Sequence, residues 1–381
     1  MRSAAVLVLE DGSRFEGHSF GAAGQRLGEV VFATGMTGYQ ETLTDPSYAG
    51  QIVVMTAPHI GNTGMNDDDA ESRQIWVEGF AVRDLSPRPS NFRSTRSLED
   101  DLTHDGVVGI SGVDTRAITL VLREAGVMRG GVFSGEALDA SPEDQLETVR
   151  ATPGMEGQSL SDRVSVEATR VVAAIGEALG VLAVIDLGIK ESTVHELAAR
   201  GFEVHILPAR SSWVEVCALS PVALFYSNGP GDPAASEAQV EVLQEALRAK
   251  LPFFGICFGN QLLGRALGFG TYKLKYGHRG INQPVLDKSS GRVEITSQNH
   301  GFAVSAPLDG VLESPAGFGR VEVSHYSLND DVVEGLRALD IPAFSVQYHP
   351  EAAAGPRDAN HLFDRFRDMV VASVSPTGGV A

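Results

Sequence analysis

Short apolar runs alternate with helix-like segments from about Gly180 onwards, and this alternation limits the possible folds more than any other feature. Four of the runs are VLAVIDLG (181–188), FEVHILP (202–208), VALFYSNG (222–229) and LPFFGIC (251–257). Near-continuous apolar strands separated by helices are typical of a parallel sheet covered on both faces. Ligands of such sheets bind beyond the carboxyl ends of the strands, so we expect the functional residues there.

One helical segment has a clear start and a clear apolar face. Asp232 can cap it, and Pro233 suits the first helical position. Apolar side chains recur on one face at Val240, Leu243 and Leu247. These signals predict a helix over residues 233–250.

The first third of the chain is rich in predicted strands. VLVLEDGSRFEG (6–17) indicates two strands around an Asp-Gly turn, and GEVVFATG (28–35) and GQIVVMTAP (50–58) indicate further short strands. A polar stretch with Pro142 and Pro153 follows and has no sustained apolar period. The chain is therefore expected to be an α/β protein, with an N-terminal β-rich α/β domain before this stretch and a mostly parallel sheet flanked by helices after it. The expected limits are 1–145 and 179–372, with a connecting segment at 146–178 and a flexible tail at 373–381.

Composition excludes several classes of function. The 381 residues are 43% hydrophobic and carry a formal net charge of −19, which argues against nucleic-acid binding. The N-terminus resembles neither a signal peptide nor a membrane span, so we expect a cytoplasmic protein with no membrane partner. The two cysteines, Cys217 and Cys257, give neither a disulfide framework nor a metal-binding spacing, and no metal site is predicted.

Cys257 stands in Gly-Ile-Cys-Phe-Gly (255–259), which has the spacing of a nucleophile elbow. An apolar strand precedes it and a helical pattern follows it, so the turn would lift the sulfur clear of the sheet. A helix N-terminus beside a cysteine favours the thiolate form. The alternative is that Cys257 is a small buried core residue.

A cysteine nucleophile needs a base and a group that orients the base. The apolar run from Ile341 to Tyr348 leads directly into His349, with Glu351 two residues later. In extended backbone these two side chains point the same way, so the carboxylate could hold one imidazole nitrogen. The alternative is that His349 only ends a strand before a proline.

A third strand end carries SNGPGDP (227–233). Asn-Gly and Pro-Gly are ordinary turn residues. The loop also exposes backbone N–H groups, and those of Gly229 and Phe258 could stabilise a tetrahedral oxyanion.

The motifs NGPGDP, GICFGNQ and YHPE, in this order, closely resemble those of class I (triad) glutamine amidotransferases over roughly residues 180–370. The resemblance implies that a class I glutamine amidotransferase domain occupies 179–372, with Cys257 as nucleophile, His349 as general base and acid, and Glu351 as the residue that orients His349. In that family a glutamyl thioester forms on the cysteine, ammonia leaves, and water releases glutamate.

The stretches 28–64 and 112–126 resemble the small, glutamine-hydrolysing subunits of carbamoyl phosphate synthetases, a family that serves arginine and pyrimidine biosynthesis. The resemblance implies a set of contacts to L-glutamine: Ser47, Gly229, Gly231, Phe258, Gln261, Asn299, Gly301 and Phe302. For Ser47 and Asn299 local turn capping is the alternative. The stretch KYGHRGINQPV (275–285) also matches, and a structural role there is as plausible as a catalytic one.

One position departs from the family pattern, because Asn260 stands where histidine is most common. Asparagine cannot carry a proton, so we expect it to adjust hydrogen bonding near the elbow rather than remove activity. Phe258, often leucine in the family, is expected to act through its backbone.

The chain has no Gly-rich phosphate loop of the GxxxxGK[ST] type. The resemblance accordingly implies no cofactor on this chain, with ATP and Mg²⁺ on a large synthetase subunit that receives the ammonia. Two other hypotheses remain: an amidotransferase serving another synthetase, such as those that make anthranilate or guanylate, and a non-catalytic subunit that kept the fold.

Overall fold

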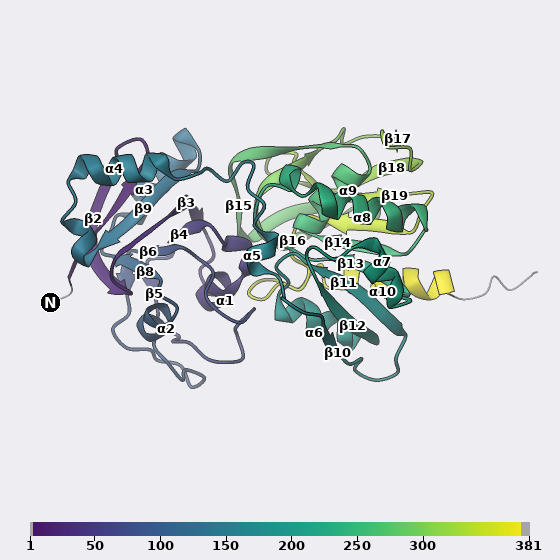
Figure 1. The fold of residues 1–381 in the computed structure, drawn as a ribbon, viewed down its shortest axis with the longest axis horizontal. Coiled ribbons are helices and arrows are strands. Elements are labelled where there is room, and N and C mark those ends of the chain that lie inside the picture. Colours follow the sequence, from purple (N-terminus) through teal and green to yellow (C-terminus); the bar gives the residue numbers. More distant parts are fainter. Residues whose placement is uncertain (1–2, 375–381) are drawn as a thin grey trace, which may run out of the picture. The chain divides into compact units, whose positions relative to one another are not determined.

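The computed structural model describes residues 3–374. It divides into two compact units (Figure 1). Unit 1 comprises residues 1–158 and 275–280, and unit 2 comprises 159–274 and 281–381. Among the described residues no helix is both long and apolar enough to span a bilayer.

Unit 1 is built on a closed barrel with the strand order β1-β2-β8-β6-β4-β3-β9. The barrel strands are β1 (Ala4–Leu9), β2 (Arg14–Gly21), β3 (Gln25–Ala33), β4 (Gln51–Met55), β6 (Gly79–Val82), β8 (Val108–Ser111) and β9 (Met128–Ser134). A separate two-stranded sheet joins β5 (His59–Ile60) and β7 (Asp84–Leu85). The helices are α1 (Tyr39–Thr44), η1 (Pro46–Tyr48), α2 (Leu98–His104), α3 (Thr115–Ala125), η2 (Gly135–Leu138) and α4 (Pro142–Ala151).

The strands predicted for the first third of the chain are confirmed. β1 and β2 form an antiparallel pair in which Val8 lies opposite Arg14, and β3 runs parallel to β4. Alternate residues of β1 pack on opposite faces: Leu7 and Leu9 join a core with Ile118 of α3, whereas Val6 and Val8 pack with Val149 of α4. One face of β1 therefore packs in the core shared with α3, and the other face packs in the core shared with α4.

Helix α4 lies within the polar stretch that was expected to connect the domains. Ser141 caps it by accepting a hydrogen bond from the Asp144 N–H, and Pro142 opens it. Only Val149 of α4 is a fully buried apolar residue, so the helix has a narrow apolar face that sequence periodicity did not reveal. The limits 1–145, 146–178 and 179–372 stay a prediction.

Unit 2 contains a mixed sheet with the order β10-β12-β11-β13-β14-β20-β19-β18-β15-β16, with β17 paired to β18. Its strands are β10 (Arg170–Val172), β11 (Gly180–Asp186), β12 (Phe202–Pro208), β13 (Ala223–Tyr226), β14 (Phe253–Ile256), β15 (Gly270–Asp287), β16 (Arg292–Ser305), β17 (Leu312–Glu313), β18 (Arg320–Ser327), β19 (Val333–Ala338) and β20 (Ala343–Val346). Its helices are α5 (Ser161–Val164), α6 (Glu191–Ala199), α7 (Trp213–Ala218), η3 (Pro233–Ala235), α8 (Glu237–Arg248), α9 (Phe258–Ala266) and α10 (His361–Val374).

The expected parallel sheet is confirmed in the centre of unit 2, where β12, β11, β13, β14 and β20 run parallel. Beyond β20 the sheet continues antiparallel through β19 and β18. Its two faces carry separate cores, because Ala183 and Ile185 of β11 pack with α8 and α9, whereas Leu182 and Val184 pack with α6 and α10.

The single helix predicted over 233–250 is wrong in its first turn. Asp232 accepts a hydrogen bond from the Ala234 N–H and caps the short 3-10 helix η3 instead. Ser236, at φ −113° and ψ 44°, separates η3 from α8. The predicted face is confirmed within α8, where Val240, Leu243 and Leu247 are buried.

The stretch 275–285 has a structural role at its start. Residues 275–280 of β15 belong to unit 1, where the Val127 N–H donates to the Lys275 carbonyl at 2.9 Å and the Thr34 N–H donates to the Arg279 carbonyl at 3.1 Å. At the other end of the chain, the first two residues of the expected tail 373–381 end α10, and the remaining residues lie outside the described part.

Candidate active site

Two adjacent parallel strands place the predicted cysteine and histidine at one edge of the sheet in unit 2. Ile256 of β14 lies opposite Val346 of β20, and the Cys257 N–H donates to the Val346 carbonyl at 2.8 Å. His349 follows β20, and its N–H donates to the Ser297 carbonyl at 2.9 Å. Both residues lie just beyond the carboxyl ends of their strands, where ligands of such sheets bind.

The turn at Cys257 is sharp. Cys257 is the residue before the first turn of α9 and has φ 54° and ψ −99°, a positive φ that non-glycine residues rarely adopt. Gly259 makes the turn possible, because a Cβ at this position would lie 2.4 Å from the Tyr226 carbonyl oxygen. A strained, non-helical cysteine at a strand-to-helix turn is the geometry of a nucleophile elbow.

The thiol of Cys257 is buried, with 2% of the residue exposed, and packs among apolar side chains of unit 2. Its Sγ donates a weak hydrogen bond to the Asn299 carbonyl at 3.6 Å. Core packing alone does not require the positive φ, whereas presenting the sulfur at the strand end does.

His349 is held by Glu351, as the spacing predicted. The two side chains are buried, and Nδ1 of His349 lies 2.7 Å from Oε1 of Glu351. Burial lowers the pKa of His349, but the Glu351 charge, the Cys257 side chain and the Glu351 hydrogen bond raise it, to about 10. His349 Nε2 has no nitrogen or oxygen partner within residues 3–374, and the Cys257 side chain is close enough to raise the pKa of the ring.

Lys190 completes this arrangement, and the sequence analysis missed it. Its Nζ lies 3.2 Å from Oε1 of Glu351 and donates to the Ala353 carbonyl at 3.0 Å. Burial raises the pKa of Glu351, but Lys190 and His349 lower it, to about 2. Lys190 lies four residues beyond β11, so the rule that function gathers at strand ends was the only available signal.

The SNGPGDP loop packs tightly beside the elbow. The Gly259 N–H donates to the Ser227 carbonyl at 3.1 Å, and the Leu187 N–H donates to Ser227 Oγ at 2.9 Å. A Cβ on Gly229 would lie 2.1 Å from the Leu187 carbonyl oxygen, so only glycine fits there. Gly231, at φ 103°, bridges to Ser159 in the same unit.

Several of the predicted glutamine contacts gather on unit 2. Gln261 lies on α9 one turn after the cysteine, and its Nε2 donates to the Phe302 carbonyl at 2.9 Å. Asn299, Gly301 and Phe302 belong to β16, and Asn299 provides the carbonyl that accepts from Cys257. Phe258 is the first residue of α9.

Ser47 belongs to unit 1, because it is part of η1, whereas the other predicted glutamine contacts belong to unit 2. Its N–H donates to Oδ1 of Asp45 at 2.9 Å, and the residue is 6% exposed. Asp45 therefore supplies the cap of this turn, and Ser47 supplies a donor to it. The role of Ser47 in glutamine binding stays a prediction.

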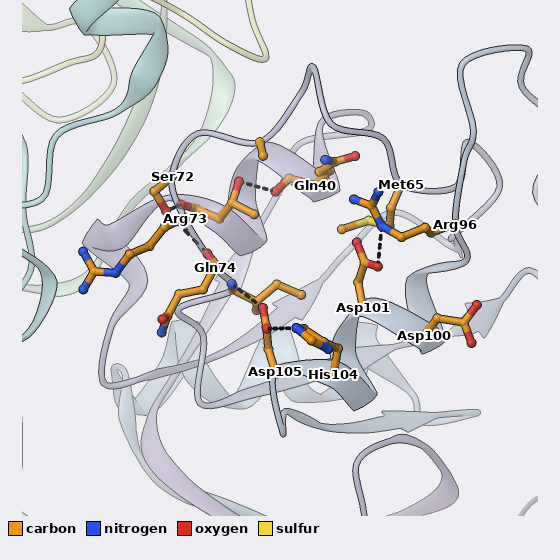
Figure 2. A pocket seen from close by; sticks show the side chains of 13 residues that line it. Gln40, Met65, Ser72, Arg73, Gln74, Arg96, Asp100, Asp101, His104 and Asp105 are labelled. Carbon is orange, nitrogen blue, oxygen red and sulfur yellow. Dashed lines mark hydrogen bonds and ion pairs between the residues drawn. The ribbon is translucent and has the colours of Figure 1, made fainter. Parts of the chain in front are cut away.

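Unit 1 also contains a cavity of about 500 Å³, lined by residues of α1, α2 and the loop before β6 (Figure 2). Its polar groups are largely paired: Arg96 donates to Asp101 at 2.8 Å, and the Ile75 N–H donates to Asp105 at 2.7 Å. None of the predicted site residues lines it. We assign it no part in the chemistry of unit 2.

Comparison with known proteins agrees with this geometry. A model of class I glutamine amidotransferases matches residues 183–369, so the fold and site of unit 2 define a class I glutamine amidotransferase domain. A model described as the carbamoyl-phosphate synthase small chain, CPSase domain, matches residues 7–132.

Relatives of similar length show the particular family. Carbamoyl phosphate synthase small chains of Streptomyces avermitilis and Streptomyces coelicolor are each 62% identical to this chain, covering 96% and 97% of it and 96% of each relative. The small chain of Bifidobacterium longum is 56% identical over 96% of this chain and 94% of its own length. This chain belongs to the family of carbamoyl phosphate synthase small chains, which confirms the resemblance found in the sequence.

Proposed function

We propose that this chain is the glutaminase subunit of a carbamoyl phosphate synthase. It hydrolyses L-glutamine to glutamate and ammonia, and a large subunit uses the ammonia with bicarbonate and ATP to make carbamoyl phosphate for arginine and pyrimidine biosynthesis. The ATP and Mg²⁺ belong to the large subunit, and the complex works in the cytoplasm. The observation that carries the proposal is the buried His349–Glu351–Lys190 arrangement at the strand end next to the Cys257 elbow.

Cys257 is the proposed nucleophile. His349 Nε2 takes the thiol proton, and the sulfur attacks the side-chain amide carbon of glutamine. The carbonyl electrons move to oxygen and give a tetrahedral oxyanion. The N–H groups of Gly229 and Phe258 stabilise this oxyanion, because both belong to turns fixed by close packing.

His349 then returns the proton to the leaving nitrogen, and the C–N bond breaks to give ammonia and a glutamyl thioester. A water molecule attacks the thioester with His349 as base, which releases glutamate and restores the thiol. Glu351 holds Nδ1 of the imidazole and stabilises its charged form, and Lys190 keeps the Glu351 carboxylate ionised.

The free amino acid must be held by groups from several loops, because it carries both an ammonium and a carboxylate. The proposed contacts in unit 2 are Gly229, Gly231, Phe258, Gln261, Asn299, Gly301 and Phe302, and Ser47 of unit 1 is the remaining one. Gly301 and Phe302 offer backbone groups, whereas Gln261 offers a carboxamide.

The proposal is tested with the chain assembled with its large subunit. In the Cys257→Ser variant, carbamoyl phosphate formation from glutamine is expected to fall by more than about a thousandfold, because the hydroxyl is a far weaker nucleophile here. Formation from ammonium should stay close to the unsubstituted rate, since the synthetase reactions use the other subunit. An unchanged glutamine-driven rate in this variant would refute the assignment.

A further inference from the structure

A chain of four hydrogen bonds joins the elbow helix to the strand that leads into His349. The Ser345 hydroxyl donates to Asn260 Oδ1 at 2.8 Å, and Asn260 Nδ2 donates to Gln347 Oε1 at 3.0 Å. Gln261 Nε2 donates both to the same Gln347 oxygen at 3.3 Å and to the Phe302 carbonyl at 2.9 Å. The side chains of this amide chain are buried, at 0–2% exposure.

The direction of every bond in the amide chain is fixed by the Phe302 carbonyl, which can only accept. Gln261 must therefore turn its NH₂ toward Phe302, and its second N–H meets Gln347. The Gln347 oxygen must accept this bond. Asn260 must therefore donate its NH₂ to the same oxygen and accept the Ser345 hydroxyl with its own oxygen. Gln347 Nε2 is left without a partner among the described residues, a cost that buried amides rarely carry without a reason.

The orientation leaves one acceptor unused. Oε1 of Gln261 is buried and has no hydrogen-bond partner in residues 3–374. Gln261 follows Cys257 by one helical turn, and its N–H donates to the Cys257 carbonyl at 3.2 Å, so the two residues are joined through their backbones. A desolvated amide oxygen on a residue one turn after the nucleophile suits a charged N–H donor.

We propose that Gln347 and Asn260 are positioning residues that fix the Gln261 carboxamide so that its oxygen binds the α-ammonium of glutamine. They act on substrate selection and do not touch the reacting atoms. This inference rests on the proposed function and on Gln261 as a glutamine contact. It makes the amide chain a determinant of the preference for an α-amino acid over the same amide without its amino group.

The inference also accounts for asparagine at position 260. A neutral imidazole offers one N–H donor and one acceptor nitrogen, and the asparagine amide offers an NH₂ group as donor and a carbonyl oxygen as acceptor. Asn260 thus supplies the donor to Gln347 and the acceptor for Ser345 that a neutral histidine would supply. It does so without a group that titrates near neutral pH.

Two variants break the amide chain in different ways. Asn260→Asp keeps the shape of the side chain but offers only acceptors. Gln347 must then turn its NH₂ toward position 260, and the same NH₂ meets the NH₂ of Gln261. Gln347→Met removes the shared oxygen. Asn260→His keeps a donor and an acceptor and serves as the conservative replacement. Gln239→Met is the matched control, because Gln239 is half-buried and donates to a backbone carbonyl, that of Ala209, outside the amide chain.

The measurement compares L-glutamine with 4-carbamoylbutanoate, the same amide without the amino group, as substrates of the assembled enzyme. We expect the ratio of the two kcat/KM values to fall by about tenfold or more in Asn260→Asp and Gln347→Met, through a higher KM for glutamine, because a hydrogen bond to a charged group is lost. The ratio should stay unchanged in Gln239→Met and be restored toward the original value in Asn260→His.

An equal loss of activity on both substrates in Asn260→Asp and Gln347→Met would mean that the amide chain is only structural, and the inference would be wrong. The proposed function is judged separately, because it fails only if the unsubstituted enzyme does not cleave glutamine at Cys257. A circular dichroism melt of each variant identifies any loss of folding.

Discussion

At the scale of single residues, the site depends on charges that are buried together. His349, Glu351 and Lys190 are each at most 4% exposed, so the charge of each would be costly without the others. The shared environment raises the pKa of His349 and lowers that of Glu351. Imidazolium and carboxylate are therefore the favoured forms at neutral pH, which suits the proposed role of His349, to hold the thiol proton until it passes to the leaving nitrogen.

Removing the Glu351 carboxylate should lower the pKa of His349. In Glu351→Gln the charge that raises the pKa of His349 is gone, while burial, which lowers it, remains. We expect the pKa of His349 to fall from about 10 toward or below its ordinary 6.5. Titration of the histidine ring signals by NMR measures this.

A second carboxylate gives the control for that titration. Glu203 lies 2.6 Å from His205 at a half-exposed site of the same unit, so Glu203→Gln also removes a histidine partner. The pKa of His349 should not change in that variant. A pKa of His349 that stays near 10 in Glu351→Gln would show that the carboxylate is not its cause.

At the scale of secondary-structure elements, the elbow requires close contact between β13 and the start of α9. The contact is between backbones, because the Gly259 N–H donates to Ser227 and a Cβ at Gly259 would meet the Tyr226 carbonyl oxygen at 2.4 Å. A backbone oxygen cannot rotate away as a side chain can, so any side chain here must displace the helix.

Gly259→Ala is expected to destabilise unit 2 by about 2 kcal/mol and to reduce glutamine cleavage more strongly than this alone explains, because the Phe258 N–H moves with the helix. Gly270→Ala is the control, since nothing lies within 4 Å of a Cβ there. Thermal unfolding and the glutamine-driven rate are measured together. Equal behaviour of the two variants would contradict the close contact.

Helices and strands were predicted correctly where neighbouring residues give the signal, and wrongly where packing sets the limits of the element. The strand before Cys257 and the helix after it followed from apolar runs and glycines. The predicted helix over 233–250 failed at its start, because Asp232 caps the 3-10 helix η3 and Ser236 leaves helical geometry before α8. A cap and a proline signal the start of a helical turn but not how far the turn continues.

At the scale of the whole molecule, acid is expected to weaken unit 2 through a buried histidine. Burial lowers the pKa of His325 to about 4. The charges of Arg365 and His361 also lower it, whereas those of Asp287 and Glu334 raise it. The unfolded chain binds a proton near pH 6.5 and the folded chain does not, so stability rises with pH over this range. Stability should therefore be lost as the pH falls from about 6.5 to about 4, by on the order of 3 kcal/mol.

The two tryptophans allow this to be measured in the intact chain. Trp76 belongs to unit 1 and Trp213 to unit 2, so a Trp76→Phe background leaves fluorescence that reports only on unit 2. The urea midpoint at pH 5 should lie below that at pH 7, and His325→Gln should reduce this difference. If the urea midpoints at pH 5 and pH 7 differ equally with and without His325→Gln, His325 is not the source of the difference.

The central strands of unit 2, the elbow and the placing of Glu351 two residues after His349 could be predicted from the amino-acid sequence, because each depends on neighbours in the chain. It also contained motifs specific enough to identify the family. Lys190, Gln347 and the orientation of Gln261 were beyond it, since each acts through residues far away in the sequence. The folded chain brings these groups together and excludes water from them. That exclusion shifts the pKa values, and the Phe302 carbonyl sets which way the Gln261 amide turns.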